Sequence, residues 1–231
     1  MHCIGYDAVE ILDTVLASTL KVKRGEAAFE RDSVLFDEIQ YSWPIVAGLM
    51  WAATRSSGKL NVLDLGGALG SGYFQNRCFL TDLSEVCWNV VEQEHFVSVG
   101  RAHVQGDQLG FYFSIEECLE ENQPNVILLS SALQYLECPF ETIRSLSSVG
   151  ADCLIIDRTP IGSDRRLLVQ HVPPSIYPAS YPMWVFGKDE LCKSLDPDWR
   201  VVARNSSPEG RVFTPDGFEF IFEGMLMERR K

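Results

Sequence analysis

The first 58 residues space their apolar side chains as amphipathic helices do. In "DAVEILDTVLASTL" and, more loosely, in "SVLFDEIQYSW", apolar residues recur three and four positions apart. Ser42 and Pro44 mark the start of a further helix, and Gly58 marks its end. We therefore predict an N-terminal helical cap over residues 1–58.

From residue 60 onward, short apolar runs alternate with amphipathic segments. The runs are apolar at consecutive positions, as in strands that are buried on both faces of a sheet. The segments between them are long enough for crossover helices, and Ser114 with Glu117 forms a capping-box pair at the start of one. This alternation predicts an α/β fold with a parallel, doubly wound sheet. The five runs are "LNVLDL", "EVCWNVVE", "LGFYFS", "NVILLSS" and "DCLIIDR".

A segment rich in proline and aromatic residues follows the fifth run, at about residues 159–186. It has too many prolines for a regular element and is too apolar for a disordered linker. We predict a long ordered loop that contacts substrate, since such loops are usually functional. Beyond it, "KDELCKSL" predicts a short helix, and "WRVVARN" and "FEFIFEGMLMER" predict two antiparallel edge strands. Residues 59–231 then form one Rossmann-like domain.

Composition narrows the range of partners. The formal net charge is −12 and the basic residues form no run, which disfavours a nucleic-acid substrate. The seven cysteines contain no C-x-x-C pair, which suits free thiols in a reducing cytoplasm. The N-terminus lacks the pattern of a signal peptide, and the most apolar stretch is too short to span a bilayer. The sequence therefore predicts a cytoplasmic protein without a membrane span, and it leaves the oligomeric state open.

A cluster of glycines directly follows the first predicted strand. Gly66, Gly67 and Gly70 come just after Asp64, at a strand end that leads into a helix. Folds of this class bind nucleotides there, and bare backbone permits close approach to a ligand. Glu92 ends the second strand, at the spacing of an acid that binds ribose hydroxyls. Asp64 would repel a pyrophosphate but suits a cation, which favours S-adenosylmethionine (SAM) over NAD.

Taken together, these motifs resemble a family of class I methyltransferases associated with bacterial surface-polysaccharide and related biosynthetic gene clusters. The similarity rests on "VLDLGGALGSGYFQNR", "WNVVEQ", "LLSSALQYLE", "IIDRTP" and "VPPSIYPASYPMW", with "ERDSVLFDEIQYSWP" upstream. It implies a Rossmann-like sheet of seven strands, mostly parallel with an antiparallel edge, and SAM as cofactor. Ala68 departs from the general pattern, which often has glycine there. The cofactor-binding residues that the resemblance supports are Asp64, Gly66, Gly67, Gly70, Glu92, Phe113, Ser114, Ser130, Ser131 and Gln134.

Methyl transfer to a hydroxyl needs an aligned acceptor and is helped by a general base. The candidate bases are His171 and Asp157, although a structural histidine and an ion pair of Asp157 with Arg158 are equally open interpretations. Tyr135 is a candidate for orienting the acceptor. The histidines and acids show no metal-site spacing, so we expect no metal. The candidate substrate residues are Arg158, for an anionic group, and Tyr177, Tyr181 and Trp184, for stacking on a sugar or for packing alone.

The sequence therefore predicts a SAM-dependent methyltransferase that acts on a small-molecule or carbohydrate-linked acceptor, with oxygen as the first choice and nitrogen the second. Two alternatives stay open at this point. A nicotinamide-dependent oxidoreductase would share the ribose-binding acid, and a non-catalytic module could keep the methyltransferase fold.

Overall fold

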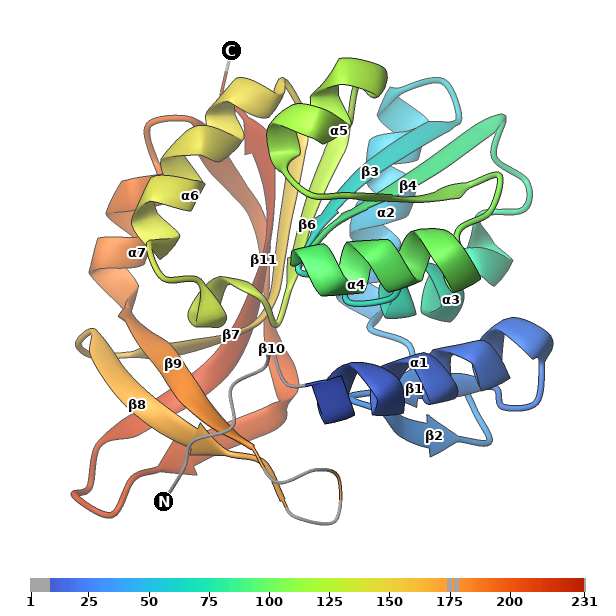
Figure 1. The fold of residues 1–231 in the computed structure, drawn as a ribbon. Helices are drawn as coiled ribbons and strands as arrows, with labels where there is room; N and C mark the ends of the chain where they lie inside the picture. Colours follow the sequence, from blue (N-terminus) through green and yellow to red (C-terminus); the bar gives the residue numbers. More distant parts are fainter. Residues whose placement is uncertain (1–8, 174–175, 177–178, 231) are drawn as a thin grey trace.

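The computed structural model describes residues 9–173, 176 and 179–230 (Figure 1). Its central feature is a sheet in the strand order β10-β11-β7-β6-β3-β4-β5. The pairs among β3 to β7 are parallel, whereas β11 runs antiparallel to β7 and β10. The strands are β3 Lys59–Leu65, β4 Glu85–Val91, β5 Leu109–Tyr112, β6 Val126–Ser130, β7 Cys153–Gly162, β10 Trp199–Phe213 and β11 Glu219–Arg229.

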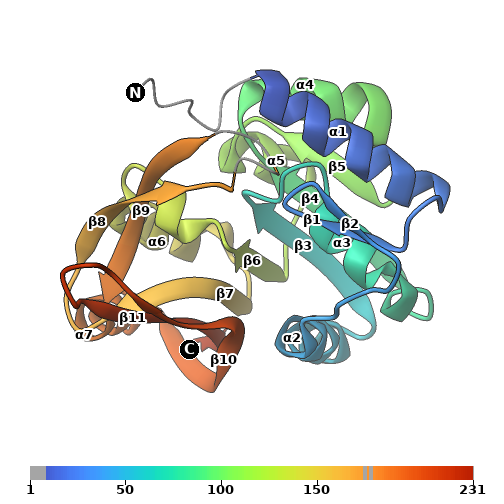
Figure 2. The same cartoon turned by 90° about the horizontal axis from the view of Figure 1, so that it is seen from below.

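Helices cover both faces of this sheet, so the doubly wound α/β prediction is confirmed. One core cluster joins the sheet to α1 to α4, and the other joins it to α5, α6 and α7. Figure 2 shows α2 and α6 on opposite sides of the strands. The apolar runs form β3 to β7 because their side chains are buried in both clusters. The helices are α1 Val9–Arg24, α2 Trp43–Arg55, α3 Ser71–Asn76, α4 Glu94–Val99, α5 Ile115–Glu121, α6 Pro139–Leu146 and α7 Lys188–Leu195.

Several predicted local features are confirmed. The helix over "KDELCKSL" is α7, and the two late strands are β10 and β11. The Ser114 hydroxyl caps α5 by accepting the backbone N–H of Glu117 at 3.1 Å. The Glu117 carboxylate accepts the N–H of Phe113 at 2.6 Å, one residue earlier than in a standard capping box.

The N-terminal segment is not helical throughout. Within "SVLFDEIQYSW", where a helix is predicted, the chain instead forms strand β2 Val34–Phe36, which makes a hairpin with β1 Phe29–Arg31 just before it. Its two turn residues, Asp32 and Ser33, both have positive φ, as in the tight turns that join antiparallel strands. That helical prediction is wrong because the hairpin is stabilised by tertiary packing on α1 and α3, which local spacing does not reveal.

The division of the chain at residue 58 stays a prediction. Helix α2 packs directly on β3, β7 and β11 and shares its core cluster with the sheet. Gly48 permits this approach, since a Cβ there would lie 2.6 Å from Ile155 Cδ1. The segment before residue 58 therefore supplies one of the layers of the Rossmann-like fold.

The proline-rich segment contains more regular structure than its composition suggests. Strand β7 continues to Gly162, and β8 Arg166–His171 pairs antiparallel with β9 Ser180–Gly187. Strand β9 also pairs with β7 at its far end, so this hairpin extends the central sheet. Pro182 is tolerated because β9 pairs there on one side only within the described residues. The prediction of an irregular loop is wrong for these strands.

Candidate functional site

The glycine cluster forms the turn between β3 and α3. Gly66 has φ +76° and Gly70 has φ +86°, and the intervening Ala68 adopts φ +49°. A Cβ on Gly66 would lie 2.7 Å from the Cβ of Ala132, so the backbone passes close to the segment after β6. Residue 66 is therefore required to be glycine for two reasons: its φ is positive, and its backbone lies too close to Ala132 to leave room for a side chain.

Gly66→Ala is expected to lower the free energy of unfolding by about 2 kcal/mol, because it adds a steric contact to a strained φ. Gly150→Ala is the matched control, since Gly150 has φ +83° and a Cβ added there would meet no atom within 4 Å. We expect about 1 kcal/mol there. Urea denaturation of both variants measures the difference, and equal losses would show that the Ala132 contact costs nothing.

Asp64 lies beneath this turn. Its side chain is 3% exposed, and its Oδ2 accepts the indole N–H of Trp88 at 2.9 Å. A Cβ on Gly67 would come within 2.5 Å of the same oxygen, so the carboxyl group fits closely under the backbone. The pKa of Asp64 is raised from 3.8 to about 7. Burial is the main cause, the Trp88 hydrogen bond opposes the rise, and the charge of Glu92 adds to it. This placement assigns Asp64 a part in holding the turn; direct contact with a cofactor stays a prediction.

A hollow of about 360 Å³ lies at the carboxyl ends of β4 and β5, lined by Glu92, Gln93, Glu94 and Phe113. The Glu92 carboxylate accepts the backbone N–H of Gln93 at 2.7 Å. Burial raises its pKa, and hydrogen bonds from the backbone of Gln93 and Ala68 oppose that rise. Glu92 thus joins the hollow to the glycine turn.

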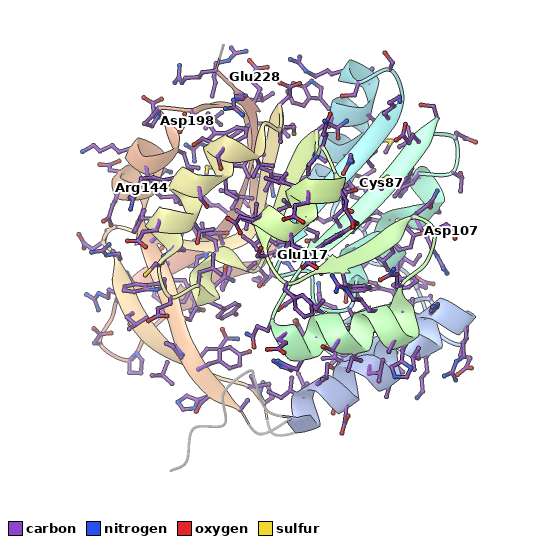
Figure 3. All side chains as sticks on the ribbon, turned by 45° about the horizontal axis from the view of Figure 1, so that its top comes forward. Cys87, Asp107, Glu117, Arg144, Asp198 and Glu228 are labelled. Carbon is purple, nitrogen blue, oxygen red and sulfur yellow. The ribbon has the colours of Figure 1, made fainter. Side chains whose placement is uncertain are left out.

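Phe113 presents a large apolar surface to this hollow, with 45% of the residue exposed. The Arg101 guanidinium lies 4.6 Å from its ring centroid and forms a 2.8 Å ion pair with Glu117, which Figure 3 labels. A second hydrogen bond joins Arg101 Nε to the Phe111 carbonyl at 2.8 Å. These contacts hold Phe113 in place. The hydroxyl of the neighbouring Ser114 is already engaged in capping α5.

The segment after β6 is held in a strained conformation. Ser131 has φ +56°, and its N–H donates to the Asp157 carbonyl at 2.9 Å. The fully buried Gln134 donates from Nε2 to Ser131 Oγ at 3.0 Å and to the Arg158 carbonyl at 3.2 Å. Arg158 itself has φ +49°. Strained non-glycine residues persist where surrounding contacts hold them, and they cluster at functional sites.

Asp157 and Arg158 lie in the middle of β7, where Asp157 pairs with Ser130 at the end of β6. Asp157 Oδ2 is 3.4 Å from Ser130 Oγ and 3.7 Å from Arg158 Nε. Asp157 is 3% exposed, and burial raises its pKa while the charge of Arg158 lowers it. The ion pair offered as an alternative in the sequence is present, and the carboxyl group still has an elevated proton affinity.

Tyr135 completes this end of the site. Its hydroxyl donates to Gln170 Oε1 on β8 at 2.8 Å, and its ring meets that of Tyr181 edge-on at 5.3 Å. Burial raises the pKa of Tyr135, so the phenol stays protonated. The β8–β9 hairpin, at the lower left of Figure 1, therefore brings Tyr181 to a position beside the segment after β6.

Other predicted site residues are not brought to this place. Side chains alternate between the two faces of a strand, so His171 points to the opposite face of β8 from Gln170. Trp184 likewise lies on the opposite face of β9 from Tyr181 and packs with the α5–α7 core cluster. Tyr177 lies outside the described residues. We therefore leave His171 and Trp184 out of the proposed acceptor site.

Sequence reasoning missed Glu30. This residue of β1 is 3% exposed, and its carboxylate accepts the hydroxyl of Ser71, the first residue of α3. Glu30 precedes the glycine turn by more than thirty positions in the chain. The packing of the β1–β2 hairpin on α3 brings Glu30 next to Ser71, and no local sequence pattern indicates this contact.

Two negative findings concern the described residues alone. No helix in that part of the chain is long and apolar enough to cross a membrane. Among the same residues, no group of three histidine, cysteine or acidic side chains could hold a metal ion.

Comparison with known proteins identifies the fold through solved structures. No family model and no curated protein matches the chain. One similar structure is the N-terminal domain of EvdMO1, crystallised in the presence of S-adenosylhomocysteine (SAH) and D-fucose. Its TM-score is 0.56 at 13% identity, over 91% of this chain and 95% of that one. The CcbJ methyltransferase from Streptomyces caelestis has a TM-score of 0.50 at 14% identity, over 80% and 90% of the two chains. The glycopeptide N-methyltransferase MtfA complexed with sinefungin also has 0.50, at 12% identity over 80% and 92%. The chain thus has the Rossmann-like methyltransferase fold.

Proposed function

We propose that this protein is a SAM-dependent methyltransferase. The observation that carries the proposal is the hollow beside the glycine turn, lined by Glu92 and Phe113. It suits a nucleoside, because a carboxylate accepts hydrogen bonds from ribose hydroxyls and an aromatic side chain packs against adenine. The bare backbone of Gly66 and Gly67 suits the rest of the donor, which must lie close to the turn.

The charges around the turn favour SAM over a nicotinamide dinucleotide. A pyrophosphate binds best at a helix start that offers backbone N–H groups and no competing anion. Here the carboxylate of Glu30 accepts a hydrogen bond from the hydroxyl of Ser71, the first residue of α3, and Asp64 lies under the turn that precedes this helix. Two acids at this place suit the cationic sulfonium and ammonium groups of SAM.

SAM supplies an activated methyl group, so the protein has mainly to align an acceptor with it. In the proposed mechanism, Glu92 and Phe113 hold the nucleoside. Tyr135 and Tyr181 orient the acceptor beside the segment after β6. Asp157 takes the proton of the attacking hydroxyl, and its elevated pKa makes it a better base than an ordinary carboxylate.

We propose an oxygen acceptor on a small molecule or a sugar. Two tyrosines, a glutamine and a charged Asp–Arg pair combine apolar faces with hydrogen-bonding groups, as recognition of a sugar ring requires. The structure of the EvdMO1 domain was obtained with D-fucose, which is consistent with a sugar as acceptor. The net charge of −12 continues to disfavour nucleic acid. The six cysteines in the described part of the chain form no disulfide, which supports a cytoplasmic location.

Calorimetric titration with SAH and with NAD tests the cofactor. We expect one site for SAH and no binding of NAD; the reverse result would favour the oxidoreductase alternative. Transfer of label from methyl-labelled SAM to a panel of free and nucleotide-linked sugars then tests catalysis. A protein that binds neither SAH nor SAM would be a non-catalytic module.

A further inference from the structure

Glu30 is a buried carboxylate with free hydrogen-bonding capacity. Its Oε1 accepts the Ser71 hydroxyl, and its Oε2 accepts the backbone N–H of Ser33 at 3.2 Å. An ionised carboxylate has about four acceptor sites, so these two bonds leave about half of them unused. Because the residue is 3% exposed, water supplies little of the remainder.

The charge of Glu30 also lacks a close partner. Burial raises the pKa of Glu30, hydrogen bonds from Ser71 and Ser33 lower it, the charge of Asp32 raises it, and the charge of Arg158 lowers it least. In the described part of the chain no basic group lies within 4.0 Å of the Glu30 carboxylate, and Arg158 Nε is instead 3.7 Å from Asp157. A buried carboxylate in this state is stabilised by any cation that reaches it.

Glu92 contacts the middle of the glycine turn, and Glu30 contacts the residue that follows it. Glu92 is bonded to the backbone of Ala68 and lines the hollow for the nucleoside, whereas Glu30 is bonded to Ser71, directly after Gly70. A donor whose nucleoside lies against Glu92 crosses the turn with its other end, which in SAM and SAH carries the amino acid. Asp64 is less suited to meet that end, because it lies under the backbone and is bonded to Trp88.

We propose that Glu30 binds the α-ammonium group of the donor's amino-acid moiety. This inference rests on the proposed SAM-binding function. It gives the β1–β2 hairpin a role in cofactor recognition, with the carboxylate oriented for that contact by Ser71 and Ser33.

The test compares SAH with 5′-methylthioadenosine, which keeps the nucleoside and the sulfur but has no amino-acid moiety. Glu30→Gln is expected to weaken SAH binding about tenfold, which corresponds to about 1.4 kcal/mol, and to change methylthioadenosine binding less than about twofold. Asp37→Asn is the matched control: it removes one charge from an exposed residue that directly follows strand β2 of the same hairpin, and we expect both affinities to stay unchanged.

The two ligands separate recognition from structural support. If Glu30 only held the hairpin on α3, Glu30→Gln would weaken both ligands equally, and the inference would be overturned. An unchanged SAH affinity would overturn it too, whereas absence of SAH binding to the wild type would refute the proposed function instead. Should Glu30→Gln fail to fold, the wild type titrated with SAH lacking its α-amino group decides: a loss of about tenfold supports the contact, and no loss contradicts it.

Discussion

Glu92→Gln is expected to weaken SAH binding about 100-fold while leaving the fold intact. The carboxylate would accept bonds from two ribose hydroxyls, and each hydrogen bond to a charged group contributes about 1.5 kcal/mol or more. Glutamine has the same shape but offers one oxygen and no charge. Burial raises the pKa of Glu92, so its ionised form costs the empty protein stability, and the variant should unfold at an equal or higher temperature.

Glu94→Gln is the control for this experiment, because Glu94 lines the same hollow but ends no strand. We expect it to change SAH affinity less than about threefold. Calorimetry gives the affinities and thermal denaturation without ligand gives the stabilities. If Glu92→Gln kept wild-type affinity, or failed to fold, Glu92 would be a structural carboxylate and the placement of the nucleoside would be wrong.

Asp64→Asn is expected to abolish a large part of the pH dependence of stability. The pKa of Asp64 is about 7 in the folded protein, against an ordinary value of 3.8. Between these values the folded chain holds a proton that the unfolded chain has released, so stability falls as pH rises from about 4 to 7. At about 1.4 kcal/mol per pH unit, the loss reaches at most about 4 kcal/mol above pH 7.

The asparagine variant keeps an oxygen for the Trp88 indole but carries no charge to desolvate. Relative to wild type, it should therefore gain stability as pH rises from 4 to 8, while the two proteins differ little at pH 4. Urea denaturation at a series of pH values measures this difference. Other acids with raised pKa values, such as Glu30 and Asp157, act equally in both proteins and cancel in the comparison. Parallel pH profiles would show that Asp64 titrates normally.

The sequence was a good guide where the relevant signal is local. Each buried strand from β3 to β7 is a short apolar run, because both of its faces contact a hydrophobic layer. The glycines around Gly66 are visible because the turn needs positive φ and space for Ala132. Glu92 could be identified because it directly follows a strand whose end the run itself defines. Its predicted bond to ribose still awaits the SAH titration.

Local signals failed where distant segments decide the structure. Residues 34–36 are a strand because they pair with residues 29–31 on a surface made by α1 and α3. In the proline-rich segment, pairing of β8 with β9 overrides the unfavourable prolines. Because side chains alternate along a strand, His171 faces away from Gln170 and Trp184 faces away from Tyr181. A shift of one residue in the register would turn each of these side chains to the other face of the hairpin.

The sequence alone thus determined the Rossmann-like class, the glycine turn and the acid that follows β4, since each depends on neighbouring residues in the chain. Tertiary structure alone decided that Asp64 lies under the turn, that Glu30 reaches Ser71 and that Tyr135 meets Tyr181. The physical reason is that the chemistry of a side chain follows from the residue type at that position alone. The neighbours of that side chain in space depend on strand register and helix packing, which involve residues far apart in the sequence.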